Sequence, residues 1–82
     1  MFHKVKEVKA IEEYVLEVEF YDGIIKKYDV SPLFEKWKVF EQLKTEDGLF
    51  KQVKVDQGGY GISWNDEIDL SCEELWNNGI AQ

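Results

Sequence analysis

The sequence predicts an α+β fold: a small antiparallel sheet with two or three short helices packed on one face, in the order β-β-β-α-β-β-α. Three observations lead to this class. Apolar and charged residues alternate over residues 15–20, which is typical of a strand with one buried face. Turn residues separate such runs, at 22–23 and again at 57–61. Ser-Pro and Ser-x-x-Glu patterns, at 31–32 and 71–74, mark two helix starts.

The first part of the chain predicts a meander of three strands. Residues 4–11 are rich in β-branched side chains, and the two glutamates that follow are expected to turn the chain. The strand at residues 14–20 places Glu17 and Glu19 on the face opposite its apolar residues. Asp22 and Gly23 both tolerate positive φ, so they predict the hairpin turn into a third strand.

The middle of the chain predicts helical structure. Ser31 is expected to cap a helix that begins at Pro32, because the first helical position leaves its N–H unpaired and proline has none. The helix is expected to break near Lys38, and Thr45 to cap a further short turn. One helical stripe should face the sheet: Leu33, Phe34, Trp37 and Phe40.

The last part of the chain predicts a second hairpin and a closing helix. Residues 51–56 and 60–64 each alternate, and glycines lie between them. Ser71 and Glu74 predict a capping box, in which each side chain binds the other's backbone N–H. The helix should end at Asn78 or Gly79.

Length and composition narrow the classes of function. The 82 residues are expected to form a single domain, residues 1–82. A net charge of −7 disfavours direct binding of nucleic acid and favours a basic protein partner. The single cysteine cannot form an internal disulfide, which fits the cytoplasm. No signal peptide or membrane-spanning run is predicted, so we expect no membrane partner.

The sequence repeats an Asp-aliphatic-Ser motif, at residues 29–31 and 69–71. A catalytic interpretation would make one of these serines a nucleophile, which needs an adjacent base. The chain has one histidine, His3, near its terminus. Helix capping explains both serines better, so we expect no catalytic residue and no cofactor.

Other candidate sites have structural and functional interpretations side by side. The glycines of residues 56–61 favour a hairpin turn over a phosphate site, because a strand follows them. The acidic turn Asp66–Asp69 favours solvated carboxylates over a metal site. The position of Cys72 favours a packed or merely exposed thiol over a reactive one. The three tryptophans favour core positions, with a ligand groove or a protein interface as alternatives: Trp37, Trp64 and Trp76.

Three stretches, "LEVEFYDGIIKKYDVSPLF", "VFEQL" and "LFKQVKVDQGGYGISWNDEIDLSCEELW", resemble a prokaryotic family, domain of unknown function 2442. The resemblance covers nearly the whole chain. Family members often have a Gly-Pro-like turn before "VFEQL" and a proline after the last-strand tryptophan, where this chain has "EKWK" and Asn65. It implies an α+β domain, often encoded beside another small protein in a toxin–antitoxin-like arrangement, with no catalytic residue set.

Together these observations predict a cytoplasmic protein-binding or regulatory module, the antitoxin-like partner of a small basic protein. A homo-oligomer is also compatible with the sequence. The alternatives are a small ligand-binding module, or a small enzyme that uses Cys72 or the acidic turn. The candidate partner-binding residues are Glu17, Glu19, Trp37, Trp64 and Trp76.

Overall fold

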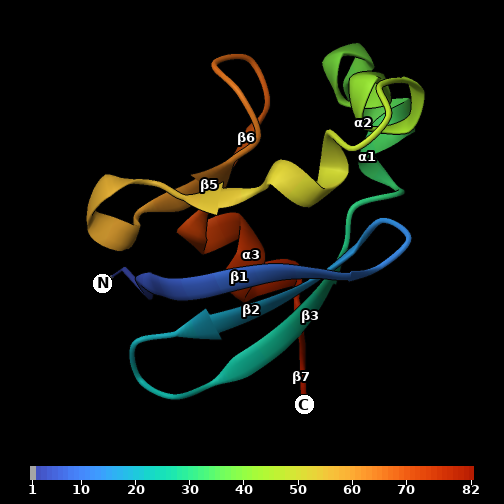
Figure 1. Ribbon diagram of the computed structural model, residues 1–82. Coiled ribbons are helices and arrows are strands. Elements are labelled where there is room, and N and C mark those ends of the chain that lie inside the picture. The colour runs from blue at the N-terminus through green and yellow to red at the C-terminus, as the bar shows by residue number, and fades with distance from the viewer. Residues whose placement is uncertain (1) are drawn as a thin grey trace.

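A computed structural model describes residues 2–82 and confirms the α+β class (Figure 1). Within these residues the strands form two small antiparallel sheets. The first has the order β1-β2-β3-β7: β1 (Val5–Glu12), β2 (Val15–Phe20), β3 (Ile25–Asp29) and β7 (Ile80–Ala81). The second has the order β4-β5-β6: β4 (Lys54–Val55), β5 (Gly61–Ser63) and β6 (Asp69–Ser71).

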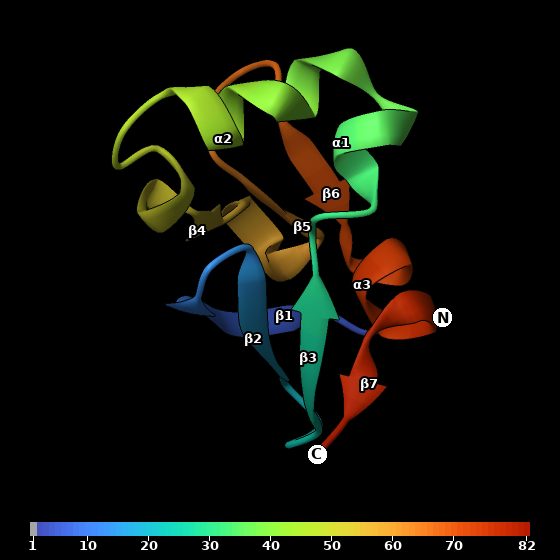
Figure 2. The ribbon, with the colours of Figure 1, turned by 90° about the vertical axis from the view of Figure 1, so that its right-hand side faces the viewer.

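The helical segments are all short. They are α1 (Leu33–Lys36), the 3₁₀ turn η1 (Lys38–Glu41), α2 (Gln42–Thr45), the 3₁₀ turns η2 (Phe50–Gln52) and η3 (Gln57–Gly59), and α3 (Cys72–Asn78). Helix α3 lies between the two sheets, whereas α1 and α2 lie beyond the end of β3 (Figure 2). The predicted order of elements is present, with β6 and β7 as two short strands that the sequence did not predict.

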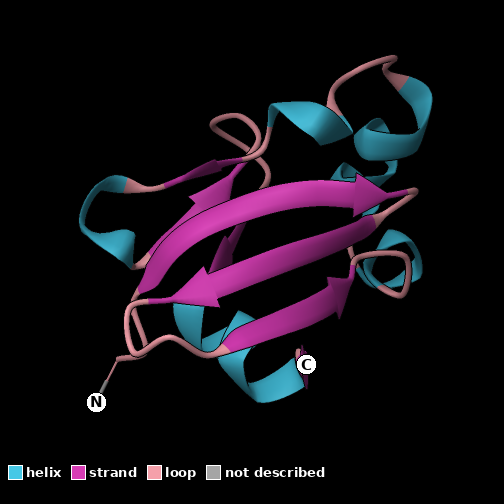
Figure 3. Ribbon diagram, turned by 60° about the horizontal axis from the view of Figure 1, so that its bottom comes forward, coloured by secondary structure: helices cyan, strands magenta, loops and turns pink. Residues whose placement is uncertain are grey.

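The core lies between the two sheets. Leu16, Val18 and Phe20 alternate along β2 and are fully buried, as the sequence predicted. Ile62 of β5 and Leu75 of α3 are equally buried. The opposite face of the first sheet is open, and no helix among the described residues covers it (Figure 3).

The turn between β1 and β2 contains Tyr14 at φ 60°, the one positive-φ residue other than glycine in residues 2–82. Packing explains why a tyrosine accepts this conformation. Its ring meets the rings of Phe34 and Phe50 edge-on, with centroids 5.0 and 5.6 Å away. Its carbonyl also accepts a 2.8 Å hydrogen bond from the backbone N–H of Val30. These contacts hold Tyr14 in its unusual backbone conformation and join the first hairpin to α1 and η2.

The predicted helix from Pro32 breaks at Trp37, next to Lys38, where the sequence predicted the break. Trp37 has extended backbone angles, φ −131° and ψ 119°, and separates α1 from η1. The predicted cap at Ser31 is wrong, because Pro32 is the N-terminal flanking residue and no side chain caps α1. The Ser31 hydroxyl instead donates to the Asp29 carboxylate at 2.7 Å. The predicted cap at Thr45 is also wrong, since Thr45 is the last residue of α2.

The predicted cap at Ser71 is present, and the Ser71 hydroxyl accepts a 3.1 Å hydrogen bond from the Glu74 backbone N–H. The reciprocal half of the box is wrong. The Glu74 carboxylate accepts hydrogen bonds from the Tyr28 hydroxyl at 2.7 Å and the Asn78 amide at 2.9 Å. Ser71 is also the last residue of β6, where it pairs with Gly61 of β5 in the second sheet.

The two serines of the repeated motif therefore allow a matched test. Ser71→Ala is expected to lower the free energy of unfolding by about 1 kcal/mol, because the Glu74 N–H loses its acceptor. Ser31→Ala should cost less than about 0.5 kcal/mol, because the Asp29 carboxylate still accepts from the residue 31 backbone N–H. Urea denaturation followed by circular dichroism measures both values. Equal losses would contradict the assignment of Ser71 as the cap.

Candidate functional site

The predicted acidic pair, Glu17 and Glu19, lies on the open face of the first sheet. Glu17 is opposite Lys9 in β1 and Lys27 in β3. The Glu19 carboxylate is 4.0 Å from the Lys6 ammonium. The two glutamates share one face, as predicted, but lysines lie among them, so the local charge is mixed.

The three tryptophans occupy different environments and do not form a common groove. Trp64 is 4% exposed, and its indole N–H donates to the Phe50 carbonyl at 2.9 Å. Trp76 is half-buried, with the His3 ring stacked 3.6 Å away and the Lys26 ammonium 4.0 Å from its centroid. Trp37 alone of the three is exposed, at 42%. The break in the helix at Trp37 moves its ring out of the predicted buried stripe.

Cys72 is buried, at 1% exposure, in the first turn of α3. The thiolate is the reactive form of cysteine, and reactive thiols are partly exposed in electropositive surroundings. The position of Cys72 in the core therefore supports the packed interpretation. His3 does not supply a base for a serine nucleophile, because it stacks on Trp76 and its Nδ1 lies 3.8 Å from the Asp22 carboxylate.

The acidic turn Asp66–Asp69 is held by an asparagine. The side-chain amide oxygen of Asn65, Oδ1, accepts from the backbone N–H groups of Glu67 and Ile68, at 2.9 and 3.0 Å. Ile68 is fully buried and fixes the turn, while the three acidic side chains are exposed. Within residues 2–82, no group of three histidine, cysteine or acidic residues is arranged to hold a metal ion.

The glycine-rich stretch forms a hairpin turn, as the sequence predicted, and not a phosphate loop. The Asp56 N–H donates to the Gly61 carbonyl and the Gly59 N–H to the Asp56 carbonyl, each at 2.9 Å. Antiparallel strands β4 and β5 flank the turn. Two of its amides are therefore bound within the turn and are not free for an anion.

A groove of about 400 Å³ brings Trp37 together with part of the acidic turn. We call it the Trp37 groove. Trp37 comes from the junction of α1 and η1, Glu67 and Asp69 from the acidic turn and β6, and Glu74 from α3. The complete lining is Trp37, Val39, Phe40, Glu67, Asp69, Leu70, Ser71 and Glu74. An exposed aromatic ring and three carboxylates thus line one groove.

The charged residues that line the Trp37 groove are all acidic, and the ammonium of the neighbouring Lys36 lies 4.7 Å from the centroid of the Trp37 ring. Within residues 2–82 no hydrogen bond or ion pair engages the carboxylates of Glu67 and Asp69. Glu74 is held in place by Tyr28. Burial, and then the hydrogen bond to Glu74, raise the pKa of Tyr28 above its ordinary value, so its hydroxyl remains a donor. The groove can therefore hold a cationic side chain between aromatic and acidic groups.

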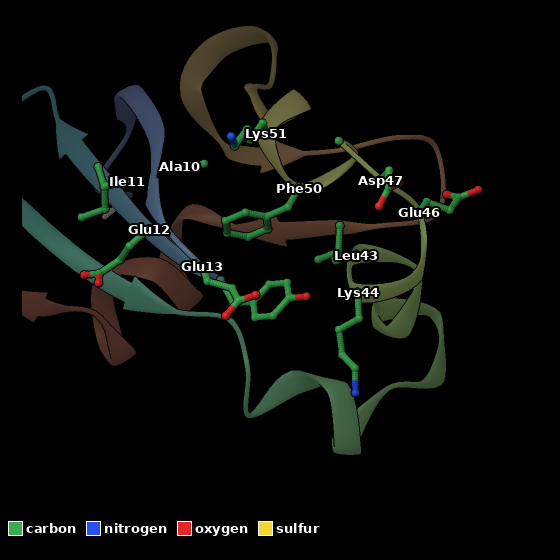
Figure 4. A pocket seen from close by; sticks show the side chains of 12 residues that line it. Ala10, Ile11, Glu12, Glu13, Leu43, Lys44, Glu46, Asp47, Phe50 and Lys51 are labelled. Atoms are coloured by element: carbon green, nitrogen blue, oxygen red, sulfur yellow. The ribbon is translucent and has the colours of Figure 1, made fainter.

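A second pocket, of about 570 Å³, lies beside the β1–β2 turn (Figure 4). We call it the Tyr14 pocket. Tyr14, Leu43 and Phe50 give it apolar walls, and its charged lining includes both signs. The charged residues are Glu12, Glu13, Lys44, Glu46, Asp47 and Lys51. Sequence reasoning missed this pocket, because its parts come from a turn and from helical segments far apart in the chain.

Comparison with known protein families gives a match. A family model described as "Protein of unknown function (DUF2442)" matches residues 5–81, which is nearly the whole chain. No curated protein and no solved structure matches. Within the described residues, no helix is long and apolar enough to cross a membrane.

Proposed function

This chain belongs to the DUF2442 family, and we propose that it is a protein-binding module whose Trp37 groove holds a basic side chain of a partner protein. The observation that carries the proposal is the combination of three carboxylates with an exposed tryptophan, whose ring already has the Lys36 ammonium 4.7 Å from its centroid. Tryptophan is enriched at the centres of protein interfaces. Cations are attracted both to its ring and to carboxylates.

The charge of the groove supports a basic partner over an acidic or neutral one. Glu67 and Asp69 are exposed and have no basic partner within the described chain, so a partner's cation would find them available. By contrast, Glu17 and Glu19 already face lysines on the open sheet. Complementary charge of this kind mainly accelerates encounter and selects among partners.

In this proposal the protein acts in the cytoplasm as a regulatory, non-enzymatic partner of a small basic protein, in an antitoxin-like pair. The burial of Cys72 supports a non-enzymatic role, because the one thiol of the chain is withdrawn from solvent. The net charge of −7 supports a basic partner.

The test uses a short arginine- and lysine-containing peptide as the probe, with an acidic peptide of equal length as its counterpart. The basic peptide is expected to shift the indole N–H resonance of Trp37 and the amide resonances of Glu67 and Asp69. The double variant Glu67→Lys with Asp69→Lys should weaken this binding roughly 10- to 100-fold, because like charges would then face each other. Rising salt should also weaken it, since salt screens charges over about 8 Å at physiological ionic strength.

The control is Glu17→Lys with Glu19→Lys, which makes the same charge change on the open sheet. It should leave peptide binding close to that of the wild type. If it instead weakens binding as much as the groove variant, the partner surface is the sheet. If the Trp37 resonance does not move with millimolar basic peptide, the groove has no such role.

A second candidate function is the binding of a small amphipathic molecule in the Tyr14 pocket. The observation in its favour is that the one strained non-glycine residue among residues 2–82 lines an apolar-walled pocket with charges of both signs. Such a ligand would shift the resonances of Tyr14 and Phe50 and leave those of Trp37 unchanged.

A further inference from the structure

Three exposed aromatic side chains gather near the start of β1. Phe2, Tyr21 and Tyr60 are 60%, 66% and 50% exposed. The Phe2 and Tyr60 rings meet edge-on with centroids 5.5 Å apart. Lys4 connects them to Tyr21, because its ammonium lies 4.9 Å from the Tyr60 centroid and its carbonyl accepts from the Tyr21 N–H. We call this surface the aromatic patch.

Folding does not explain these rings. The core is filled by other side chains, and each ring of the aromatic patch leaves half or more of its surface in water. Single exposed apolar residues are ordinary, but a contiguous group of large ones marks an interaction site. Aromatic residues are enriched in protein interfaces relative to other surfaces.

Two shallow hollows lie beside the exposed rings of the aromatic patch. One shallow hollow is lined by residues including Phe2, Phe20 and Tyr21, and the next by residues including Val5, Tyr21 and Val55. Lys4 and Tyr21 line both hollows, so the two are continuous. A ring that projects from one copy of this surface can therefore enter a hollow on another.

The charges of the aromatic patch are of both signs, with Lys4 beside Asp22 and Asp56 in the same two hollows. A two-fold interface brings a surface against itself, so that surface must be self-complementary in shape and charge. The aromatic patch meets this requirement. The Trp37 groove does not, because its carboxylates would face carboxylates.

We propose that the chain forms a two-fold homodimer through the aromatic patch, with Tyr21 and Tyr60 of each copy packed into the hollows of the other. The inference does not depend on the proposed function. The start of β1 lies beside the turn before β5, away from α1, so dimerisation leaves both Trp37 grooves free (Figure 1).

The test is sedimentation equilibrium of the full chain over a concentration series up to the millimolar range. The mean mass of the wild type should rise from 9.7 kDa toward twice that value. Tyr21→Ser with Tyr60→Ser should raise the dimer dissociation constant by roughly tenfold or more, since aromatic anchors dominate interface energies. Rising salt should strengthen the dimer, because it screens the repulsion between two chains of charge −7.

Two controls make the result specific. Ile80→Ser changes a residue of β7 that is 73% exposed and lies outside the aromatic patch, so it should leave the dissociation constant unchanged. Circular dichroism and the thermal midpoint verify that each variant is folded. A chain that stays monomeric at millimolar concentration and high salt would overturn the proposal, as would dimers that the double tyrosine variant leaves intact. Loss of peptide binding to the Trp37 groove would leave it unaffected, because the two surfaces are measured separately.

Discussion

Trp64→Ala is expected to lower the free energy of unfolding by about 3–5 kcal/mol, the usual cost of removing a buried aromatic ring. Trp64 is 4% exposed and packs against Phe40 and Phe50, with ring centroids 6.1 Å away in both cases. Its indole N–H also satisfies the Phe50 carbonyl. A chain of this length has about 4–12 kcal/mol of stability in total, so the variant should lose a large part of its stability.

The matched control is Trp37→Ala, which removes the same side chain from the surface. Trp37 is 42% exposed, so its loss should cost about 1 kcal/mol or less. Urea denaturation followed by circular dichroism measures both variants without using tryptophan fluorescence. Equal losses for the two variants would show that Trp37 is a core residue and would remove the main support for the Trp37 groove.

Gly59→Ala is the second change with a large expected effect, about 2–5 kcal/mol of destabilisation. Gly59 has φ +78°, where a Cβ costs about 1–2 kcal/mol. A Cβ there would also lie 2.7 Å from the Val5 carbonyl oxygen in β1, and overpacking costs about 1–3 kcal/mol more. The close approach fixes the turn before β5 against β1 and thereby places Tyr60 beside Phe2.

Gly48→Ala provides the control, because Gly48 has almost the same backbone angle, φ +79°, and open space around its Cβ position. Gly48→Ala should lower the free energy of unfolding by only about 1–2 kcal/mol, the cost of a Cβ at positive φ. The difference between the two variants in thermal or urea denaturation measures the packing of the glycine turn on β1. If both variants lose the same stability, backbone conformation alone explains Gly59, and the contact with Val5 contributes nothing.

Features that depend on neighbouring residues could be predicted from the sequence alone. The alternation that buries Leu16, Val18 and Phe20 is a property of six consecutive residues, and the structure confirms it. The Ser71 cap likewise depends on a hydroxyl and an N–H three residues apart. The Ser31 cap had the same kind of support and is wrong, because Asp29 competes for the same hydroxyl.

Which surfaces form depends on how distant segments pack together. The sequence indicated Trp37 and the acidic turn as separate candidates, and the break at Trp37 together with the pairing of β6 with β5 brings them into one groove. Strand β7 has only two residues and exists through its pairing with β3, which is distant in the chain. The aromatic patch joins residues 2, 21 and 60 in the same way. Local patterns predict elements because their energies are local, whereas grooves and patches depend on contacts between segments that the sequence order does not specify.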